Sequence, residues 1–394
     1  MKEIVLKFII PIIIPAIILS CSGDDIDVVS VISCEDGVQN GDETGIDCGG
    51  TCGNACLPEN ALEGVIVSVL ELVSENEYIL TGPLLIRDRA SLIIQPGTVI
   101  KAEKGEDVYI AVAQGGKIFV RGNEANPVVM TSIAENPAPG DWGGLVICGH
   151  APINSAETDR SALLDIFYGG SDITDSSGVI KYLRVEYSGA AYDDSKNFNG
   201  ISFYGVGSFT TVNNIQTYGS LGNGFEFIGG TVNSKNLIAT NSGGNAIAIT
   251  DGWNGEGESW YLSGSLMAGI RIANNTNNES AIPLTEGTIN NVSLIGPVSQ
   301  GGINYTQGGG ILTFNNIYSS GLNLGINVIG SLASSLIESN NLLINSIEFD
   351  NPSSDFTPTN HSGTNTTFYT ELINPGAGNQ AMVPDWGSSW AIGF

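Results

Sequence analysis

Four cysteines lie close together in one short stretch of the chain, and their side chains can form either disulfides or a metal site. Cys34, Cys48, Cys52 and Cys56 fall within 23 residues. In an oxidising compartment they would form two disulfides, with three possible pairings. Four thiolates at these spacings can also hold a zinc ion. The export signals described below favour two disulfides, and we expect Cys148, in the apolar stretch around residue 147, to be a buried free thiol.

The same stretch carries oxygen-bearing side chains among its glycines. Asp36, Asn40, Asp42 and Asp47 are of the types that ligate Ca²⁺. Their spacing is not that of an EF-hand, and Asp-Gly and Asn-Gly pairs are also ordinary turn formers. A calcium site and a set of turns therefore both remain open, and Ca²⁺ is a possible cofactor.

The rest of the chain holds no complete catalytic set. Its two histidines, His150 and His361, have no serine or metal-ligand partner at a recognisable spacing. A polysaccharide lyase needs a base beside a cation, for which Arg271 is a partial candidate. A hydrolase needs two carboxylates, for which the adjacent Asp193 and Asp194 are candidates. These signals favour binding over catalysis without excluding an enzyme.

A glycine-rich segment at 252–264 combines aromatic and acidic residues. Trp253, Trp260 and Tyr261 are interleaved with Glu256 and Glu258. Aromatic rings in a surface loop stack on sugar faces, and carboxylates beside them accept hydrogen bonds from hydroxyls. We expect these five residues to bind a carbohydrate, unless the rings instead cover one side of the fold.

The composition narrows the class of protein. The 394 residues carry a formal net charge of −27 with only 14 Lys and Arg, so nucleic acid is excluded as a partner. The 52 glycines suit tight turns, and short runs of Val, Ile, Thr, Tyr and Phe suit strands. Long helical periodicity is absent, which indicates an all-β protein.

Residues 1–20 have the layout of a secretory signal peptide. Lys2 and Lys7 precede an apolar run at 8–19, which is shorter than the roughly 20 residues of a membrane-spanning helix. Residues 18–21 resemble the bacterial lipobox, which implies that Cys21 carries a lipid anchor. Two or more acyl chains hold a protein stably on a membrane.

Three aspartates follow the anchor within residues 22–27. This segment resembles an acidic signal that sends lipoproteins of one Gram-negative phylum to the outer face of the outer membrane. The alternative is a solvated tether that faces the periplasm. We expect the protein to be anchored in the outer membrane and to face the cell exterior.

A repeat appears in the middle of the chain. The segment 199–203 recurs at 223–227 and at 245–249, with offsets of 24 and 22 residues. A strand-rich repeat of this length predicts a parallel β-helix with three short strands per coil and about 13 coils. The alternation within the repeat places one set of side chains in the core: Ile201, Phe203, Phe225, Phe227, Ile247 and Ile249.

Several segments resemble a group of bacterial surface lipoproteins and secreted proteins. They are LIIQPGTVIKAEKG at 92–105, GDWGG at 140–144, SGVIKYLRVEYSG at 177–189 and FEFIGGTVNSKNLI at 225–238. The resemblance implies a right-handed, pectate-lyase-like β-helix but no particular reaction. Residues 34–56 resemble a cysteine-rich spacer motif found in surface proteins of the same phylum.

The sequence thus predicts four parts: a lipoprotein signal peptide at 1–20, an acidic tether at 21–33, a cysteine-rich module at 34–57 and a parallel β-helix with a C-terminal cap at 58–394. The expected function is binding or adhesion at the cell surface, with a polysaccharide or a surface protein as partner. A β-helix lyase or glycoside hydrolase is the first alternative, and a structural stalk without a small ligand is the second.

Overall fold

The protein divides into two compact units, Met1–Cys56 and Leu57–Phe394. The computed structural model describes residues 34, 39–45, 48–52, 56, 60–161, 164, 166–193 and 196–394. Among these residues no helix has both the length and the apolar character needed to cross a membrane. Cys21, Asp36, Asp47 and Asp194 lie outside the described residues.

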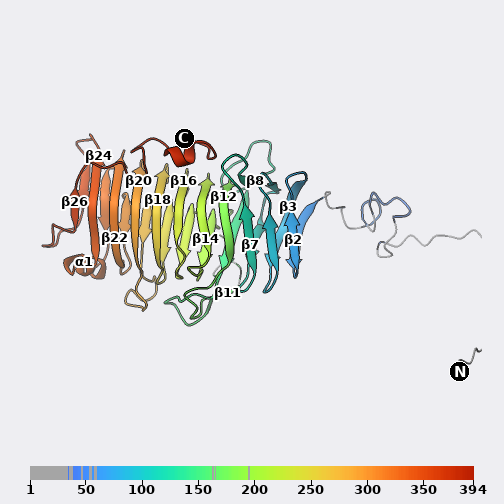
Figure 1. Cartoon of the computed structure of the whole chain (residues 1–394), viewed down its shortest axis with the longest axis horizontal. Coiled ribbons are helices and arrows are strands. Elements are labelled where there is room, and N and C mark those ends of the chain that lie inside the picture. The colour runs from blue at the N-terminus through green and yellow to red at the C-terminus, as the bar shows by residue number, and fades with distance from the viewer. Residues whose placement is uncertain are drawn as a thin grey trace, which may run out of the picture. The chain divides into compact units, whose positions relative to one another are not determined.

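The second unit is a solenoid in which parallel strands stack in rows along one axis (Figure 1). We call the first row face A. Its strands are β1 (Ala61–Ile66), β3 (Glu77–Ile86), β6 (Gly105–Val112), β9 (Trp142–Cys148), β13 (Ile201–Tyr204), β15 (Phe225–Ile228), β17 (Ile247–Thr250), β19 (Ile270–Ile272), β21 (Ile303–Tyr305), β23 (Leu324–Val328) and β25 (Thr357–Thr359).

The next row, face B, is formed by β2 (Val69–Leu72), β4 (Ser91–Ile94), β7 (Lys117–Arg121) and the first halves of longer strands. These are β12 (Gly178–Glu186), β14 (Thr211–Tyr218), β16 (Ser234–Thr240), β18 (Asn254–Ser263), β20 (Glu286–Ile295), β22 (Ile311–Ser320) and β24 (Leu342–Asp350), with β26 (Tyr369–Glu371) at the end. Their second halves continue a third row, face C, which begins with part of β3, β5 (Val99–Ala102) and β8 (Val128–Ser132). The predicted parallel β-helix with three strands per coil is confirmed.

Asparagines explain how one long strand serves two faces. Asn214, Asn236, Asn291 and Asn316 have φ between 56° and 61° at the bend of their strands. Asparagine tolerates this left-handed conformation better than other residues with a Cβ. Its side chain also links neighbouring coils, because Nδ2 of Asn236 donates to Oδ1 of Asn214 at 3.0 Å, and Asn316 donates to Asn291 in the same way at 3.0 Å.

The interior of the solenoid has the register that the repeat predicts. Phe225 aligns with Ile201 on one side and with Ile247 on the other, and all six predicted core side chains are fully buried. The rings of Phe203 and Phe227 stack with centroids 5.1 Å apart. Continuous stacking of this kind keeps water out between coils whose own cores would be too small to fold alone.

Face A contains eleven strands in the described part of the chain, fewer than the coils predicted from a uniform repeat. The difference arises because some coils carry long insertions. One insertion, residues 149–177, includes a small antiparallel hairpin of β10 (Asp159–Arg160) and β11 (Phe167–Tyr168). Another spans residues 273–285 between β19 and β20. Both insertions border the site described below.

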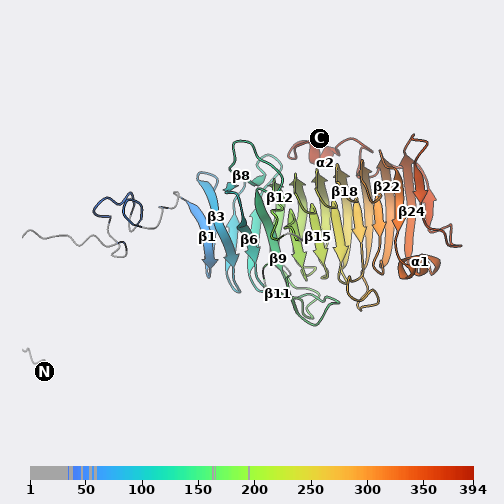
Figure 2. The ribbon, with the colours of Figure 1, turned by 180° about the vertical axis from the view of Figure 1, so that it is seen from behind.

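The C-terminal segment, residues 374–394, runs back over face C and includes the short helix α2 (Asp385–Ser388) (Figure 2). The Tyr261 hydroxyl donates to the carbonyl oxygen of Ala381 at 2.9 Å, and the Arg184 guanidinium donates to that of Trp390 at 3.0 Å. A second helix, α1 (Ser331–Glu338), precedes β24. The predicted C-terminal cap is therefore a strap that covers one face rather than a lid on the end.

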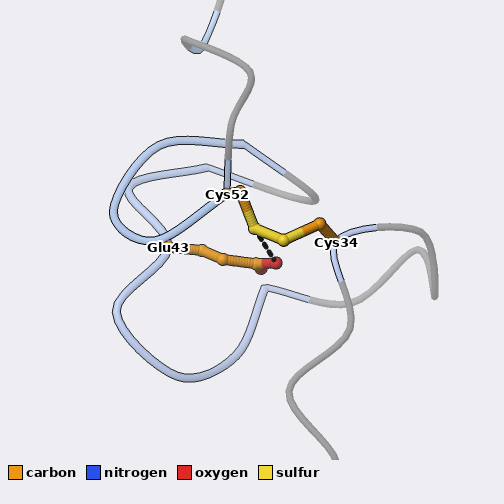
Figure 3. Close-up of side chains that lie close together, drawn as sticks. All are labelled: Cys34, Glu43 and Cys52. Carbon is orange, nitrogen blue, oxygen red and sulfur yellow. Dashed lines mark hydrogen bonds between the residues drawn. A yellow bond between two sulfur atoms is a disulfide. The ribbon is translucent and has the colours of Figure 1, made fainter.

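The first unit contains the two predicted disulfides. Cys34 pairs with Cys52 and Cys48 pairs with Cys56, so their sulfurs are not available as the thiolates of a zinc site. Figure 3 shows Glu43 beside the first disulfide, with its Oε1 3.3 Å from Sγ of Cys52. Such contacts hold the unit together, because a segment of this size has little apolar surface to bury.

Candidate functional site

The two tryptophans of the predicted carbohydrate site are inside the solenoid. Trp253 and Trp260 have no exposed surface, and Nε1 of Trp253 donates to the carbonyl oxygen of Val232 at 3.1 Å. The segment is a regular strand, β18, and not a loose loop. Its glycines are needed because a Cβ at Gly255 or Gly257 would collide with the neighbouring indole ring. The prediction that these rings stack on sugars is therefore wrong.

The other three residues of that prediction do not form a joint site with them. Tyr261 is 5% exposed and lies under the C-terminal strap. Glu258 forms an ion pair with Lys235 at 2.7 Å, and Glu256 is exposed beside it. Both glutamates line a shallow groove of about 260 Å³ on face B. They point away from the core, whereas the rings of Trp253 and Trp260 point into it and Tyr261 is covered by the strap.

The predicted calcium ligands are only partly described. Oδ1 of Asp42 accepts hydrogen bonds from the hydroxyl of Thr51 at 2.7 Å and from its backbone N–H at 3.2 Å. These bonds lower the pKa of Asp42. The backbone N–H of Asn40 donates to Oε2 of Glu43 at 2.9 Å. The contacts of Asp42 and Asn40 are those of a hydrogen-bonded turn.

A cleft of about 480 Å³ lies on the outer side of face A, over strands β13 to β19. Its floor comes from the strands and its walls from the two insertions and from residues 196–199. The lining is almost entirely polar or aromatic: Ser155, Asp159, Arg160, Tyr168, Lys196, Asn197, Asn199, Tyr204, Asn223, Glu226, Ile228, Thr250, Asp251, Arg271, Asn275, Thr276 and Asn277. A volume of this size suits a small ligand or a few sugar units.

The strand register sets the spacing of the floor. Glu226, Ala248 and Arg271 are aligned on successive rungs of β15, β17 and β19. Because rungs are about 4.8 Å apart, the Cα atoms of Glu226 and Arg271 lie about 10 Å apart with a methyl side chain between them. The small Ala248 leaves open the space that a ligand can occupy. Among the described residues, Arg271 makes no ion pair and donates instead to Gln307.

Asp251 stands at the edge of this floor, directly after β17, with φ 56°. Its Oδ1 accepts a hydrogen bond from Nδ2 of Asn275 at 2.9 Å, and the same amide donates to Oδ1 of Asn154 at 3.0 Å. Asn154 in turn donates to Oδ1 of Asn274 at 3.0 Å. This buried amide network ties the two insertions together and fixes the position of the Asp251 carboxyl group.

Two of the three carboxyl groups that line the cleft, those of Glu226 and Asp251, are easier to protonate than ordinary ones. Burial raises the pKa of Glu226, and a hydrogen bond from Asn199 and the positive charge of Arg271 oppose that rise. Burial and the neighbouring charge of Glu226 raise the pKa of Asp251 to about 6, although Arg271 again opposes this. Carboxyl groups with shifted pKa values in a cleft are typical of functional sites, because removing a carboxylate from water destabilises the protein.

Tyr204 is one of the residues that line the cleft. Its ring packs edge-on against Tyr168 with centroids 5.0 Å apart, and its side chain is 5% exposed. The Tyr204 hydroxyl has no hydrogen-bond partner among the described residues, and burial raises its pKa well above the ordinary value. The hydroxyl is not sealed from solvent, so a ligand in the cleft can form a hydrogen bond with it.

The family model for the pectate-lyase-like β-helix domain matches residues 64–391, which include the whole cleft. The chain belongs to this family. A solved structure, the Dettilon tailspike protein (gp208), is similar at 12% identity with a TM-score of 0.25; the match covers 74% of this chain and 61% of the tailspike chain. No curated protein matches the chain.

The GDWGG segment, which is part of the resemblance to pectate-lyase-like β-helices, has a structural role. The buried Trp142 donates from Nε1 to the carbonyl oxygen of Glu186 at 2.8 Å. Asp141 accepts from the Ser132 hydroxyl at 2.6 Å and pairs with Lys104 at 2.8 Å. These contacts join neighbouring turns of the chain and lie outside the cleft.

Sequence reasoning found one residue of the cleft and missed most of it. Arg271 was a candidate, whereas Asp193, His150 and His361 do not line the cleft. Glu226 carried a signal, because it occupies the outward position of the repeat that aligns with Arg271. Asp251 carried none, since it lies just outside the repeated strand and its carboxyl group is oriented by Asn275 of an insertion.

Proposed function

We propose that this protein is a polysaccharide-binding module of the cell surface that takes a segment of a glycan into the face A cleft. The observation that carries the proposal is the cleft itself, with asparagine amides, carboxyl groups and the hydroxyl of Tyr204 in its lining. Such planar hydrogen-bonding groups match the hydroxyls of a sugar ring.

The charges favour a neutral glycan over an acidic one. Three acidic side chains line the cleft, Asp159, Glu226 and Asp251, and three basic ones balance them, Arg160, Lys196 and Arg271. The whole chain has a formal net charge of −27, which repels a polyanion at long range. A neutral chain avoids this repulsion and still finds hydrogen-bond donors and acceptors of both kinds.

Binding is tested by the mobility of the purified full-length protein in gels that contain neutral or uronate-rich polysaccharides. We expect a neutral polysaccharide to retard the protein, and Arg271→Ala to weaken retention about 10- to 100-fold, because a hydrogen bond to a charged group contributes about 1.5–3 kcal/mol. Tyr204→Phe, which removes only a hydroxyl, should weaken it less.

Arg121→Ala is the matched control, because Arg121 is exposed and does not line the cleft. Glu256→Gln tests the groove on face B in the same gels. If Arg271→Ala binds like the wild type while Glu256→Gln loses retention, the ligand lies on face B and the proposal for the cleft is wrong.

Attachment to the outer membrane through a lipid on Cys21 is the second part of the proposal, and it rests on the sequence. Cys21→Ala should release the protein from the membrane fraction. Replacing the three aspartates of 22–27 by alanine should leave it anchored but protected from protease added to intact cells. If the aspartate variant stays as sensitive as the wild type, the segment does not direct export to the surface.

A further inference from the structure

We propose that the face A cleft is a catalytic site for glycoside hydrolysis, in which Asp251 and Glu226 form the pair of carboxyl groups that cleaves the bound glycan. This inference rests on the proposed binding of a glycan in the cleft and adds a reaction to it. Its basis is the relative position of the two groups, the unpartnered hydroxyl of Tyr204 and the insertions that close around them.

The register places Glu226 and Asp251 on adjacent rungs of the cleft floor. Ile228 aligns with Thr250, so Asp251 lies one rung away from Glu226 and about three residues further along the strand direction. This offset separates the Cα atoms by about 11 Å. Both side chains line the same cleft. Side chains that reach toward each other from Cα atoms this far apart can place their carboxyl groups within the range of about 5–9.5 Å that glycoside hydrolases use.

Tyr204 provides independent evidence that the cleft receives a ligand. Tyr204 aligns with Ile228 on the next strand, and Ile228 aligns with Thr250 on the strand after that. Thr250 is the residue directly before Asp251. The side chain is more than nine-tenths buried, yet its hydroxyl bonds to no described residue. A sugar hydroxyl in the cleft would form a hydrogen bond with it.

The surroundings assign different roles to the two carboxyl groups. Burial raises the pKa of Glu226 as well, but the hydrogen bond from Nδ2 of Asn199 to its Oε2 and the positive charge of Arg271 oppose that rise, and we assign Glu226 as the carboxylate of the pair. That negative charge, together with burial and Asp159, raises the pKa of Asp251 to about 6. Asp251 is therefore the proton donor at mildly acidic pH. Arg160 and Lys196 also face the cleft, but act from its walls.

The reaction consumes one water molecule for each bond that is cut. Asp251 gives its proton to the glycosidic oxygen as the bond from that oxygen to the anomeric carbon breaks. Glu226 takes a proton from water as the water oxygen bonds to the anomeric carbon. The products are a new reducing end and a free hydroxyl, and the proton returns from Glu226 to Asp251 through solvent.

The test combines reducing-end release with the binding measurement above, on the same neutral polysaccharides. We expect the wild-type protein to release reducing ends, with activity that falls as the pH rises above about 6 because Asp251 loses its proton. Asp251→Asn and Glu226→Gln should each lower turnover by about 100- to 10,000-fold and still bind the polysaccharide. Glu256→Gln, a carboxylate on face B, should keep full turnover.

Each outcome separates the two proposals. If the wild type binds a polysaccharide but releases no reducing ends between pH 4 and pH 8, hydrolysis is wrong and binding stands. If turnover survives both substitutions, or if unsaturated ends appear instead, the assigned pair is wrong. If no polysaccharide binds, both proposals fall. Unchanged circular dichroism of the two variants shows that a loss of turnover is not a loss of fold.

Discussion

Replacing Phe227 by alanine should lower the free energy of unfolding by about 3–5 kcal/mol, the usual loss for a buried phenylalanine. Phe227 has no exposed surface. Its ring stacks on Phe203 and lies near Trp253 and Trp260, with centroids 5.1, 5.8 and 6.3 Å away. The cavity would therefore open between coils, where backbone hydrogen bonds on both sides prevent collapse. Urea unfolding followed by circular dichroism measures the change.

Phe209→Ala is the matched control, because the same atoms are removed from a side chain that is 69% exposed. We expect it to change the free energy of unfolding by less than about 0.5 kcal/mol. If the two variants were equally stable, Phe227 would not be a core residue and the register on face A would be wrong.

Asp251→Asn should stabilise the protein at neutral pH while it abolishes the proposed reaction. The pKa of Asp251 is raised from an ordinary value of 3.8 to about 6. The folded protein thus holds this proton more tightly than the unfolded chain does. The stability that the group contributes is complete below about pH 3.8 and is lost as the pH rises through 6. The rise of this pKa from 3.8 to about 6 corresponds to a loss of up to about 3 kcal/mol in the free energy of unfolding when the group ionises.

An asparagine at position 251 cannot ionise, and its side-chain oxygen can still accept the hydrogen bond from Asn275. The variant therefore keeps its stability as the pH rises through 6. We expect the variant and the wild type to have similar unfolding free energies at pH 4 and the variant to be more stable at pH 7.5. Urea unfolding at both pH values measures the two differences. A variant that is less stable than the wild type at pH 7.5 would show that the ionised carboxylate is structural.

A cleft that costs stability is consistent with a functional site, because selection removes such costs where nothing depends on them. The free thiol shows the contrast. Burial raises the pKa of Cys148 to about 12, and its side chain packs against apolar neighbours with no access to solvent. Cys148 therefore behaves as a small apolar residue, as its sequence context predicts, whereas Asp251 and Glu226 keep their polar groups at a surface.

The solenoid could be predicted because its interactions repeat along the sequence. Each coil contacts mainly its neighbours, so the alternation at 199–203, 223–227 and 245–249 carries both the core and the register. The two disulfides could be expected from cysteine density, but their pairing could not. Spacing alone does not decide between three connectivities, and the backbone turns of the module do.

The site depended on contacts that have no local signature. Trp260 was misplaced because a glycine-rich segment reads as a loop, although its glycines make room for indole rings inside a strand. Asp251 was missed because Asn154 and Asn275, 121 residues apart, meet only when two insertions pack over face A. By itself the sequence determined the repeat, the core register and the cysteine-rich module. Only the tertiary structure decided which polar groups share a cleft, since insertions leave the repeat and their packing is set by contacts distant along the chain.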